Sequence, residues 1–408
     1  MKVDTMRQID YYAGVPLCFL GTLYSKCKNL LFRQPDRPLK NVLLCELSEM
    51  GSTILVDPAM KKLRKEAQVN LFFVIFKKNK VSLNLLQTVP EENIFTIREG
   101  SFISLISDTL RFLFWARSNG IDTVIDLELF SRFTALITGF CGAERVVGFH
   151  SFFNEGLYRG DFLTHKVAYN NYLHISKNFI ALVNALLDNN GEIPYSKRAI
   201  PDDEIILDKA IVTGEQKDAM HQILKKHYSD YDTKHHHVIL INPNASELLI
   251  QRKWPYEHYS KLISLILEKN KRILIYITGA PEEQAEAEAL KASVGNPRCI
   301  NFAGGTNFSQ LPALYSICDM LITNDSGPGH FSAVTDIRSY VFFGPETPAL
   351  YGSLGNSTPI FAGLACSPCV SAANHRKTAC LDNKCLQVIQ PEYVMDLITG
   401  DLEALRVP

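Results

Sequence analysis

Residues 237–278 read HVILINPNASELLIQRKWPYEHYSKLISLILEKNKRILIYIT, and this stretch decides the fold class. Two apolar runs, 238–242 and 272–278, enclose a segment over 255–270 whose apolar residues have helical spacing. A strand that is apolar at every position is buried on both faces, and a helix that joins two such strands makes them parallel. The stretch therefore predicts one strand–helix–strand unit of a parallel sheet covered on both faces.

The same alternation continues in both directions along the chain. Further strands are expected at 42–47, 69–76, 93–97, 121–128, 145–150, 300–304, 320–325 and 339–344. A polar, proline-containing connector with one helix near 215–227 separates the two series. We therefore expect an α/β protein with two doubly wound Rossmann-like domains facing a cleft, because ligands bind beyond the carboxyl ends of parallel strands. The expected order is an arm over 1–40, a first domain over 41–192, a linker over 193–234, a second domain over 235–390 and a C-terminal helix over 391–408.

Composition narrows the class of protein. The chain has 408 residues, 46% of them hydrophobic and 21% charged, with a net charge of −1. These values are ordinary for a soluble globular protein of two or three domains and exclude wholesale disorder. A chain with almost no net charge has no overall basic field with which to hold nucleic acid. No apolar run approaches the roughly 18 residues that a membrane-spanning helix needs.

The N-terminal arm combines an apolar and aromatic stretch with a basic tail. Residues 11–24 read YYAGVPLCFLGTLY, and the basic residues that follow are Lys26, Lys28, Arg33, Arg37 and Lys40. Acidic residues precede the apolar stretch and no clear cleavage site follows it, so a signal peptide is not expected. The pattern fits a segment lying in a membrane interface, or a helical arm packed on the protein. We expect a cytoplasmic protein, peripheral on the inner membrane if the first alternative holds.

The segment 321–330, LITNDSGPGH, carries the strongest indication of a binding site. A buried strand is expected to end near Asp325, and a helix to begin with Ser326 as its cap and Pro328 in its first turn. Exposed N–H groups at such a turn form an anion site, most naturally for a diphosphate, to which His330 also donates. An ordinary capped strand–helix turn remains the alternative.

Three more turns are expected on the same edge of that sheet. They are NPNAS (242–246) with Arg252 a few residues on, TGAPE (278–282) and AGGT (303–306). Small and hydroxyl residues at four neighbouring turns favour a nucleotide-diphosphate pocket. The glycine-rich signatures of P-loop NTPases and dinucleotide oxidoreductases are absent from the sequence.

An ordered series of motifs gives the chain a family resemblance. The series is LSEMGS (47–52), DLELFSR (126–132), NPNAS (242–246), RKW (252–254), TGAPEE (278–283), NFAGGT (301–306), TNDSGPGH (323–330) and FGPETP (343–348). With these motifs the chain resembles glycosyltransferase family 9, the heptosyltransferases of lipopolysaccharide core assembly. The resemblance implies a glycosyltransferase-B fold, a nucleotide-sugar in the C-terminal lobe and a lipid-linked acceptor in the N-terminal lobe. It implies no required cofactor and no catalytic metal.

The resemblance also implies roles for individual residues. The donor diphosphate and sugar would be held by Asp325, Ser326, Gly327 and His330. The phosphate-contacting hydroxyl and cation would be Ser246 and Arg252, and the base and ribose would lie near Glu282 and Thr306. The expected acceptor-binding residues are Ser48, Ser52, Asp126 and Arg132.

The general base is where the sequence departs from the family pattern. The family places an aspartate directly after the glycine of its first loop, whereas here Gly51 is followed by Ser52. A serine hydroxyl does not accept a proton at neutral pH without a base of its own. We expect Glu49 to replace the aspartate, with Glu46 and Asp57 as weaker candidates. The alternative for Glu49 is a structural carboxylate that favours the start of the following helix.

Four cysteines lie close together near the C-terminus, at positions 366, 369, 380 and 385. Cys366, Cys369, Cys380 and Cys385 could hold a structural zinc ion, although their spacing matches no common zinc module. Reduced thiols are the other main interpretation, and a disulfide is less expected in a cytosolic protein.

The leading hypothesis is an inverting, metal-independent glycosyltransferase. It would move a sugar, most plausibly heptose from ADP-heptose, to a lipopolysaccharide-core or related glycolipid acceptor. Its partners would be the nucleotide-sugar, the glycolipid and a membrane surface, with no nucleic acid. Two alternatives remain open: a nucleotide-sugar-binding protein that has lost its base, and a sugar-nucleotide epimerase on the same fold.

Overall fold

The computed structural model describes residues 3–31, 38–153, 155–188, 191–372, 374 and 376–405. The chain divides into two compact units. The first comprises Met1–Ile206 together with Ser371–Arg376, and the second comprises Leu207–Val370 together with Lys377–Pro408. The chain thus leaves the first unit inside the segment 193–234 that the sequence predicts as a linker.

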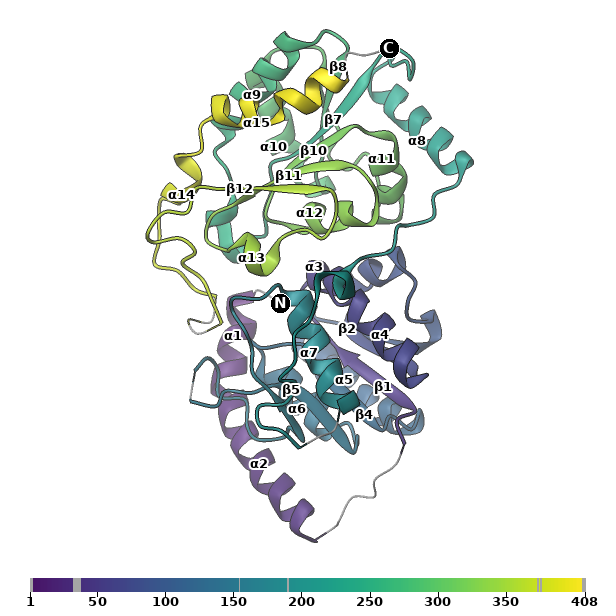
Figure 1. The fold of residues 1–408 in the computed structure, drawn as a ribbon, viewed down its shortest axis with the longest axis vertical. Coiled ribbons are helices and arrows are strands. Elements are labelled where there is room, and N and C mark those ends of the chain that lie inside the picture. The colour runs from purple at the N-terminus through teal and green to yellow at the C-terminus, as the bar shows by residue number, and fades with distance from the viewer. Residues whose placement is uncertain are drawn as a thin grey trace. The chain divides into compact units, whose positions relative to one another are not determined.

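The first unit is built on a parallel sheet with the strand order β3-β2-β1-β4-β5-β6 (Figure 1). Its strands are β1 (Asn41–Cys45), β2 (Asn70–Phe76), β3 (Ile94–Ile97), β4 (Thr123–Asp126), β5 (Arg145–Phe149) and β6 (His165–Val167). The first five lie where the sequence predicts them. Because β1 pairs with both β2 and β4, the strand order reverses at β1, and the loops after β1 and β4 meet at this switch point.

Helices cover both faces of this sheet. One face carries α3 (Met50–Leu55), α4 (Asp57–Ala67) and α7 (Ile175–Asp188), and the other carries α1 (Val3–Tyr12), α2 (Gly14–Leu31), α5 (Phe102–Ser118) and α6 (Arg132–Phe140). Short 3₁₀ segments complete the unit at η1 (Lys77–Leu85), η2 (Glu91–Asn93) and η3 (Asp202–Ile205). Phe112 and Ala116 of α5 and Ile137 of α6 share a single core with strands β1, β2 and β4.

The described part of the N-terminal arm forms α1 and α2, which pack on α6. Asp10 accepts hydrogen bonds from the backbone N–H of Arg132 and of Phe133, both at 2.9 Å, and Cys18 is fully buried. The helical arm expected from the sequence is therefore present. Of its basic residues, Arg33 and Arg37 lie outside the described residues. No described helix has both the length and the hydropathy needed to cross a membrane.

The second unit repeats the plan with a parallel sheet of order β12-β11-β10-β7-β8-β9. Its strands are β7 (His237–Asn242), β8 (Ile273–Ile277), β9 (Cys299–Asn301), β10 (Met320–Asn324), β11 (Arg338–Phe343) and β12 (Ser357–Phe361). The longer helices are α8 (Gly214–His227), α9 (Tyr256–Lys269), α10 (Gln284–Val294), α11 (Leu311–Ile317) and α15 (Pro391–Ala404). The shorter ones are η4 (Glu247–Arg252), η5 (Pro281–Glu283), η6 (Phe308–Gln310), α12 (Gly327–Phe331), η7 (Ser332–Val334), α13 (Pro348–Tyr351) and α14 (Lys384–Gln387).

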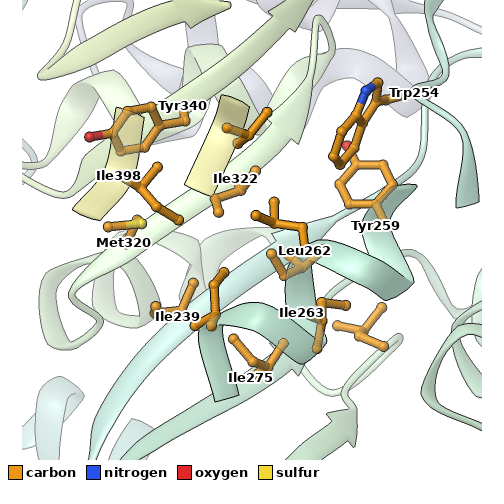
Figure 2. Close-up of a cluster of buried hydrophobic side chains, with 14 of the residues drawn as sticks. Ile239, Trp254, Tyr259, Leu262, Ile263, Ile275, Met320, Ile322, Tyr340 and Ile398 are labelled. Atoms are coloured by element: carbon orange, nitrogen blue, oxygen red, sulfur yellow. The ribbon is translucent and has the colours of Figure 1, made fainter. Parts of the chain in front are cut away.

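One hydrophobic core fixes α9 and α15 on a face of this sheet (Figure 2). Tyr259, Leu262, Ile263 and Ile266 follow each other at intervals of three, one and three along α9, so they share one side of the helix, and all are buried. Trp254 extends this core by stacking on Phe342 with ring centroids 4.2 Å apart. The segment that connects β7 to α9 is thereby tied to the sheet.

The side chain of Asn324, at the carboxyl end of β10, is fully buried and joins three parts of the second unit. Its amide nitrogen donates to the carbonyl oxygen of Pro243 at 2.7 Å. Its amide oxygen accepts from the backbone N–H of Trp254 and from the hydroxyl of Tyr259, both at 3.0 Å. One side chain therefore holds the turn after β7, the start of α9 and the end of β10 in fixed positions.

Replacing this amide tests its importance. Asn324→Ala leaves a buried carbonyl, a buried N–H and a buried hydroxyl without this partner, so we expect a loss of about 2–4 kcal/mol in the free energy of unfolding. Urea titration followed by circular dichroism measures this loss. Asn307→Ala is the control, because Asn307 is exposed and caps η6, and its replacement should cost only about 1 kcal/mol. Equal losses in the two variants would contradict the central position of Asn324.

Candidate functional site

The turn from β10 to α12 carries four of the predicted donor-binding residues. Asp325 is buried, and its backbone N–H donates to the carbonyl oxygen of Phe342 at 2.9 Å. Ser326 is the N-cap residue of α12 by its extended backbone, but the expected side-chain cap is wrong. Its hydroxyl donates to the carbonyl oxygen of Asn324 at 3.1 Å and makes no bond to the helix amides. Gly327 begins the helix, and His330 lies half-buried in it.

Arg252, at the end of η4, brings a positive charge to this turn. Its Nε lies 3.4 Å from Oδ2 of Asp325, and its Nη2 donates to Oε1 of Glu346 at 3.0 Å. Both carboxylates are buried, at 4% and 1% exposure. The orientation of Arg252 is restrained because its guanidinium faces one buried carboxylate through Nε and the other through Nη2. Asp325 and Arg252, which are far apart in the sequence, are therefore brought together.

Glu346 was not among the residues predicted for the site. It follows β11 within the motif FGPETP, so its position at the carboxyl end of a strand was visible in the sequence. A glutamate in a proline-containing loop is ordinary on a protein surface, and its burial beside Arg252 depends on the register of β11 against β10.

The remaining predicted donor residues lie on the turns after β7, β8 and β9. Ser246 follows β7 and is exposed, while Thr306 follows β9 and is half-buried. The turns after β8 and β9 are joined by a hydrogen bond from the N–H of Gly304 to the carbonyl oxygen of Gly279, at 2.9 Å. Gly304 has a φ of +72°, a conformation that favours glycine. The four predicted turns therefore lie on one sheet edge, two of them directly bonded.

Within the turn after β8, the sequence predicted a role for Glu282, but its neighbour Glu283 makes the closer contacts with the turn. Glu282 is exposed in η5. The carboxylate of Glu283 accepts a hydrogen bond from the backbone N–H of Ala280 at 2.6 Å, and burial raises the pKa of this carboxyl. Glu283 therefore fixes the turn, while Glu282 extends from it toward solvent.

In the first unit, a cluster of carboxylates follows β1 and β4. Glu128 accepts hydrogen bonds from the N–H of Leu47 at 3.0 Å and from the hydroxyl of Ser48 at 2.9 Å. Burial raises the pKa of Glu46 well above its usual range, and the charge of neighbouring Glu128 raises it further. Burial also raises the pKa of Glu128, so the two coupled carboxyls together favour retention of a proton.

Glu49 lies beside this pair at the start of α3. Ser52, the residue after the glycine of the first loop, donates its hydroxyl to Oε2 of Glu49 at 3.1 Å. Arg376, from the segment 371–376 that belongs to the first unit, forms an ion pair with Oε1 of Glu49 and lies over the ring of Phe130. The Glu49 side chain is one-third exposed and makes no capping bond to α3. The sequence did not indicate Arg376, which is separated from Glu49 by 327 positions.

Two of the predicted acceptor-binding residues have partners within the first unit. Asp126 is buried and pairs with Arg159, which is anchored by the carbonyl oxygen of Ser131 at 2.8 Å. Arg132 is buried and pairs with Asp10 of α1 at 3.1 Å. Asp57, the weaker candidate base, is fully buried with Lys61 at 2.6 Å and the hydroxyl of Thr88. These partners hold the loops after β1 and β4 in place.

None of the four clustered cysteines forms a disulfide among the described residues. Burial raises the pKa of Cys385 to about 11, and the nearby thiols of Cys369 and Cys380 add to the effect. Among the described residues, no group of three or more His, Cys, Asp or Glu side chains has an arrangement that could hold a metal ion.

A family model and several known proteins match this chain. The model of glycosyltransferase family 9 (heptosyltransferase) matches residues 116–379. Lipooligosaccharide heptosyltransferase 2 of Campylobacter jejuni subsp. jejuni serotype O:6 is 30% identical over 165 residues, which span 40% of this chain and 50% of that protein. Lipopolysaccharide heptosyltransferase 2 of Salmonella typhimurium is 30% identical over 99 residues, 24% of this chain and 28% of that protein. The chain thus spans about half, or less, of the length of these curated relatives.

Solved structures match the whole architecture at low sequence identity. ADP-heptose lps heptosyltransferase II of E. coli has a TM-score of 0.67 and 17% identity, covering 90% of this chain and 100% of that one. The E. coli heptosyltransferase WaaC with ADP has a TM-score of 0.58 and 16% identity, covering 88% and 99%. The expected glycosyltransferase-B fold is confirmed. The motifs, the fold and the family model agree, and the chain belongs to glycosyltransferase family 9, the heptosyltransferase family.

Proposed function

We propose that this protein is an inverting glycosyltransferase that moves heptose from ADP-heptose to a lipopolysaccharide-core or related glycolipid, without a metal or other cofactor. The observation that carries the proposal is the buried network of Arg252, Asp325 and Glu346 at the end of β10, in a member of family 9. One fold relative, the E. coli heptosyltransferase WaaC, was solved with ADP and with ADP-2-deoxy-2-fluoro heptose, which supports this class of donor.

The donor would bind along the carboxyl edge of the second sheet. Arg252 is held by two carboxylates through Nε and Nη2, so Nη1 lies outside these two contacts and is the donor we assign to the diphosphate. Ser326, Gly327 and His330 would contribute the hydroxyl, amide and ring nitrogen around the same anion, with Ser246 on the neighbouring turn. Asp325 would accept bonds from sugar hydroxyls, and Glu282 and Thr306 would lie near the ribose and base.

In an inverting transfer, the acceptor oxygen attacks the anomeric carbon while the bond to the diphosphate breaks. A base takes the acceptor's proton, and the donor site stabilises the charge on the departing diphosphate. We assign the base to Glu49, because its carboxylate is partly exposed and accepts a hydrogen bond from the hydroxyl of Ser52. Glu46 is a weaker candidate, because its raised pKa favours the protonated form. Ser48, Ser52, Asp126 and Arg132 would line or support the acceptor side.

The lipid-linked acceptor places the proposed reaction at a membrane. We propose that the enzyme is cytoplasmic and associates peripherally with the cytoplasmic face of the inner membrane. The exposed apolar side chains of α2 support this assignment, among them Leu17, Leu20 and Leu23.

One observation favours a second candidate, a nucleotide-sugar-binding protein without transferase activity. Ser52 stands where the family has its aspartate, so the usual base is missing, and the carboxylate of Glu49 is engaged in an ion pair with Arg376. Incubation with ADP-heptose and a panel of core-type acceptors separates the two functions. Glycosylated product supports the transferase, whereas donor binding without product across the panel supports the binding protein.

Donor binding is expected to depend on His330 and Arg252. His330→Ala removes a ring nitrogen, and Arg252→Lys removes the Nη1 that we assign to the diphosphate, so we expect the Kd for ADP to rise about tenfold. Isothermal calorimetry with free ADP measures the change. Lys225→Ala, which removes an exposed lysine of α8, should leave the affinity unchanged. Wild-type affinity in both test variants would remove these residues from the site.

Turnover is expected to depend on Glu49. Glu49→Gln keeps the size of the side chain but cannot accept a proton, so kcat should fall by roughly 10²–10⁴-fold while the Kd for ADP stays constant. Ser52→Asp, introduced into this variant, should restore part of the lost rate because the two side chains are in contact. Glu92→Gln, an exposed glutamate of the same unit, is the control. Wild-type turnover in Glu49→Gln would refute the assignment.

The raised pKa of Glu46 predicts how stability depends on pH. Because this pKa is higher in the folded state, the stabilisation by the proton is complete below pH about 4.5 and is lost as pH rises through the folded pKa. Glu46→Gln mimics the protonated form, so its melting temperature relative to wild type should rise as pH increases above about 4.5. Calorimetric melting from acidic to alkaline pH measures this change. A difference in melting temperature that stays constant with pH would contradict the raised pKa.

A further inference from the structure

Helix α5 exposes a stripe of large apolar side chains. Ile103, Ile106, Leu110 and Phe114 recur at intervals of three or four residues, so they share one side of the helix, and Ile103 and Phe114 are 81% and 75% exposed. The opposite side of α5 is also apolar and lies in the core of the first unit. A helix that covers a sheet normally presents polar residues to solvent, so a stripe of this kind indicates an interaction surface.

Helix α2 exposes a second stripe of the same kind. Leu17, Phe19, Leu20, Leu23 and Tyr24 are each about half exposed. The other side of α2 is closely packed on the unit: a Cβ added at its Gly21 would come within 3.0 Å of ring atoms of Phe140 and Phe162. The exposed side chains of α2 are therefore presented by a helix with a fixed position.

The two stripes lie on the same side of the first sheet. Helix α6 packs against both α2 and α5. Its residue Phe140 joins their C-terminal parts: the ring contacts Tyr24 with centroids 6.0 Å apart, and the carbonyl oxygen accepts a hydrogen bond from Arg117 of α5. We call the exposed side chains of α2 and α5 together the α2–α5 surface.

The charges on the α2–α5 surface are positive. The sequence of α2 contains no acidic residue, and α5 contains one, Asp108, which is buried and held by Arg98 through two hydrogen bonds of 2.8 Å. Among the side chains of these helices that the structure describes, the exposed charged ones are Lys26, Arg111 and Arg117. Neighbouring acidic groups are Asp161, 3.3 Å from Lys26, and Asp108, 3.9 Å from Arg111. The combination of large apolar and basic side chains suits an anionic lipid surface.

We propose that the α2–α5 surface binds an anionic bilayer, with its apolar side chains in the boundary between headgroups and acyl chains. This inference rests on the proposed glycolipid acceptor, which such binding would bring within reach of the first unit. A second copy of the chain fits less well, because two such surfaces placed face to face would oppose like charges. The sequence indicated the arm alone, so α5 is the new part of the surface.

The experiment uses the full chain and flotation with vesicles of phosphatidylglycerol and phosphatidylcholine. Leu110→Ser with Phe114→Ser removes two exposed side chains of α5 without touching the core, and we expect the floated fraction to fall about fivefold or more. Arg111→Glu should lower flotation at low salt, with a smaller effect at high salt. Ile211→Ser, a 94% exposed isoleucine of the second unit, is the matched control and should float like wild type.

Three results would overturn the proposal. Wild-type flotation in the α5 double variant, with loss only in Leu20→Ser, would restrict binding to α2. Equal flotation with pure phosphatidylcholine would remove the charge argument. A wild-type dimer in size-exclusion chromatography that the α5 variant dissociates would assign the surface to a second copy. Transfer to a delipidated core oligosaccharide separates this test from the proposed function, because the α5 variant should retain that activity while losing flotation.

Discussion

The second unit depends on the buried amide of Asn324. A donor and an acceptor on one short side chain are matched to a carbonyl of the turn after β7 and to an N–H at the start of α9. A buried polar group is favourable only when its hydrogen bonds are complete, so this match fixes one arrangement of the three segments. The turns that carry Ser246 and Asp325 are the direct neighbours of that amide. These two turns at the carboxyl edge of the second sheet are therefore held in position by hydrogen bonds to a buried side chain.

Each unit also buries carboxyl groups at the carboxyl edge of its sheet, and the two units compensate for this burial in different ways. In the second unit, Arg252 lies between Asp325 and Glu346, so two acids are balanced by one base. In the first unit, burial raises the pKa of both Glu46 and Glu128, which favours retention of a proton. Breaking a buried ion pair leaves an uncompensated charge, whereas a protonated acid leaves none. The two edges should therefore respond differently to pH.

Most of the fold could be predicted because its strands are buried on both faces. Apolar runs such as 69–76 and 238–242 are recognisable without any knowledge of their neighbours. Two edge strands were missed for physical reasons. β6 has only three residues, and β12 contains Pro359 and is only partly buried, as an edge strand tolerates. The sequence pattern did not indicate the exposed apolar side of α5, since periodicity alone does not tell which face of a helix is covered.

The sequence predicted those parts of the candidate site whose residues follow a single strand. It did not predict contacts between residues that are far apart in the sequence. Asp325 to His330 form one continuous motif, so they could be recognised together. Glu346 beside Arg252, Arg159 beside Asp126 and Arg376 beside Glu49 are pairs separated by 94, 33 and 327 positions. Such pairs depend on strand register and on the return of residues 371–376 to the first unit. Neither feature can be predicted from a local sequence pattern.

The first loop keeps a carboxylate beside the position at which the sequence departs from the family pattern. Residues 49 and 52 lie three apart at the start of α3, which is the spacing that brings side chains to one side of a helix. The hydroxyl of Ser52 donates to the carboxylate of Glu49 at 3.1 Å, so a carboxylate still lies next to the position where the family has its aspartate. Glutamate is longer than aspartate by one methylene, and this extra reach allows the acid to approach from one turn earlier. The ion pair with Arg376 then fixes the direction of a side chain that would otherwise have several rotamers.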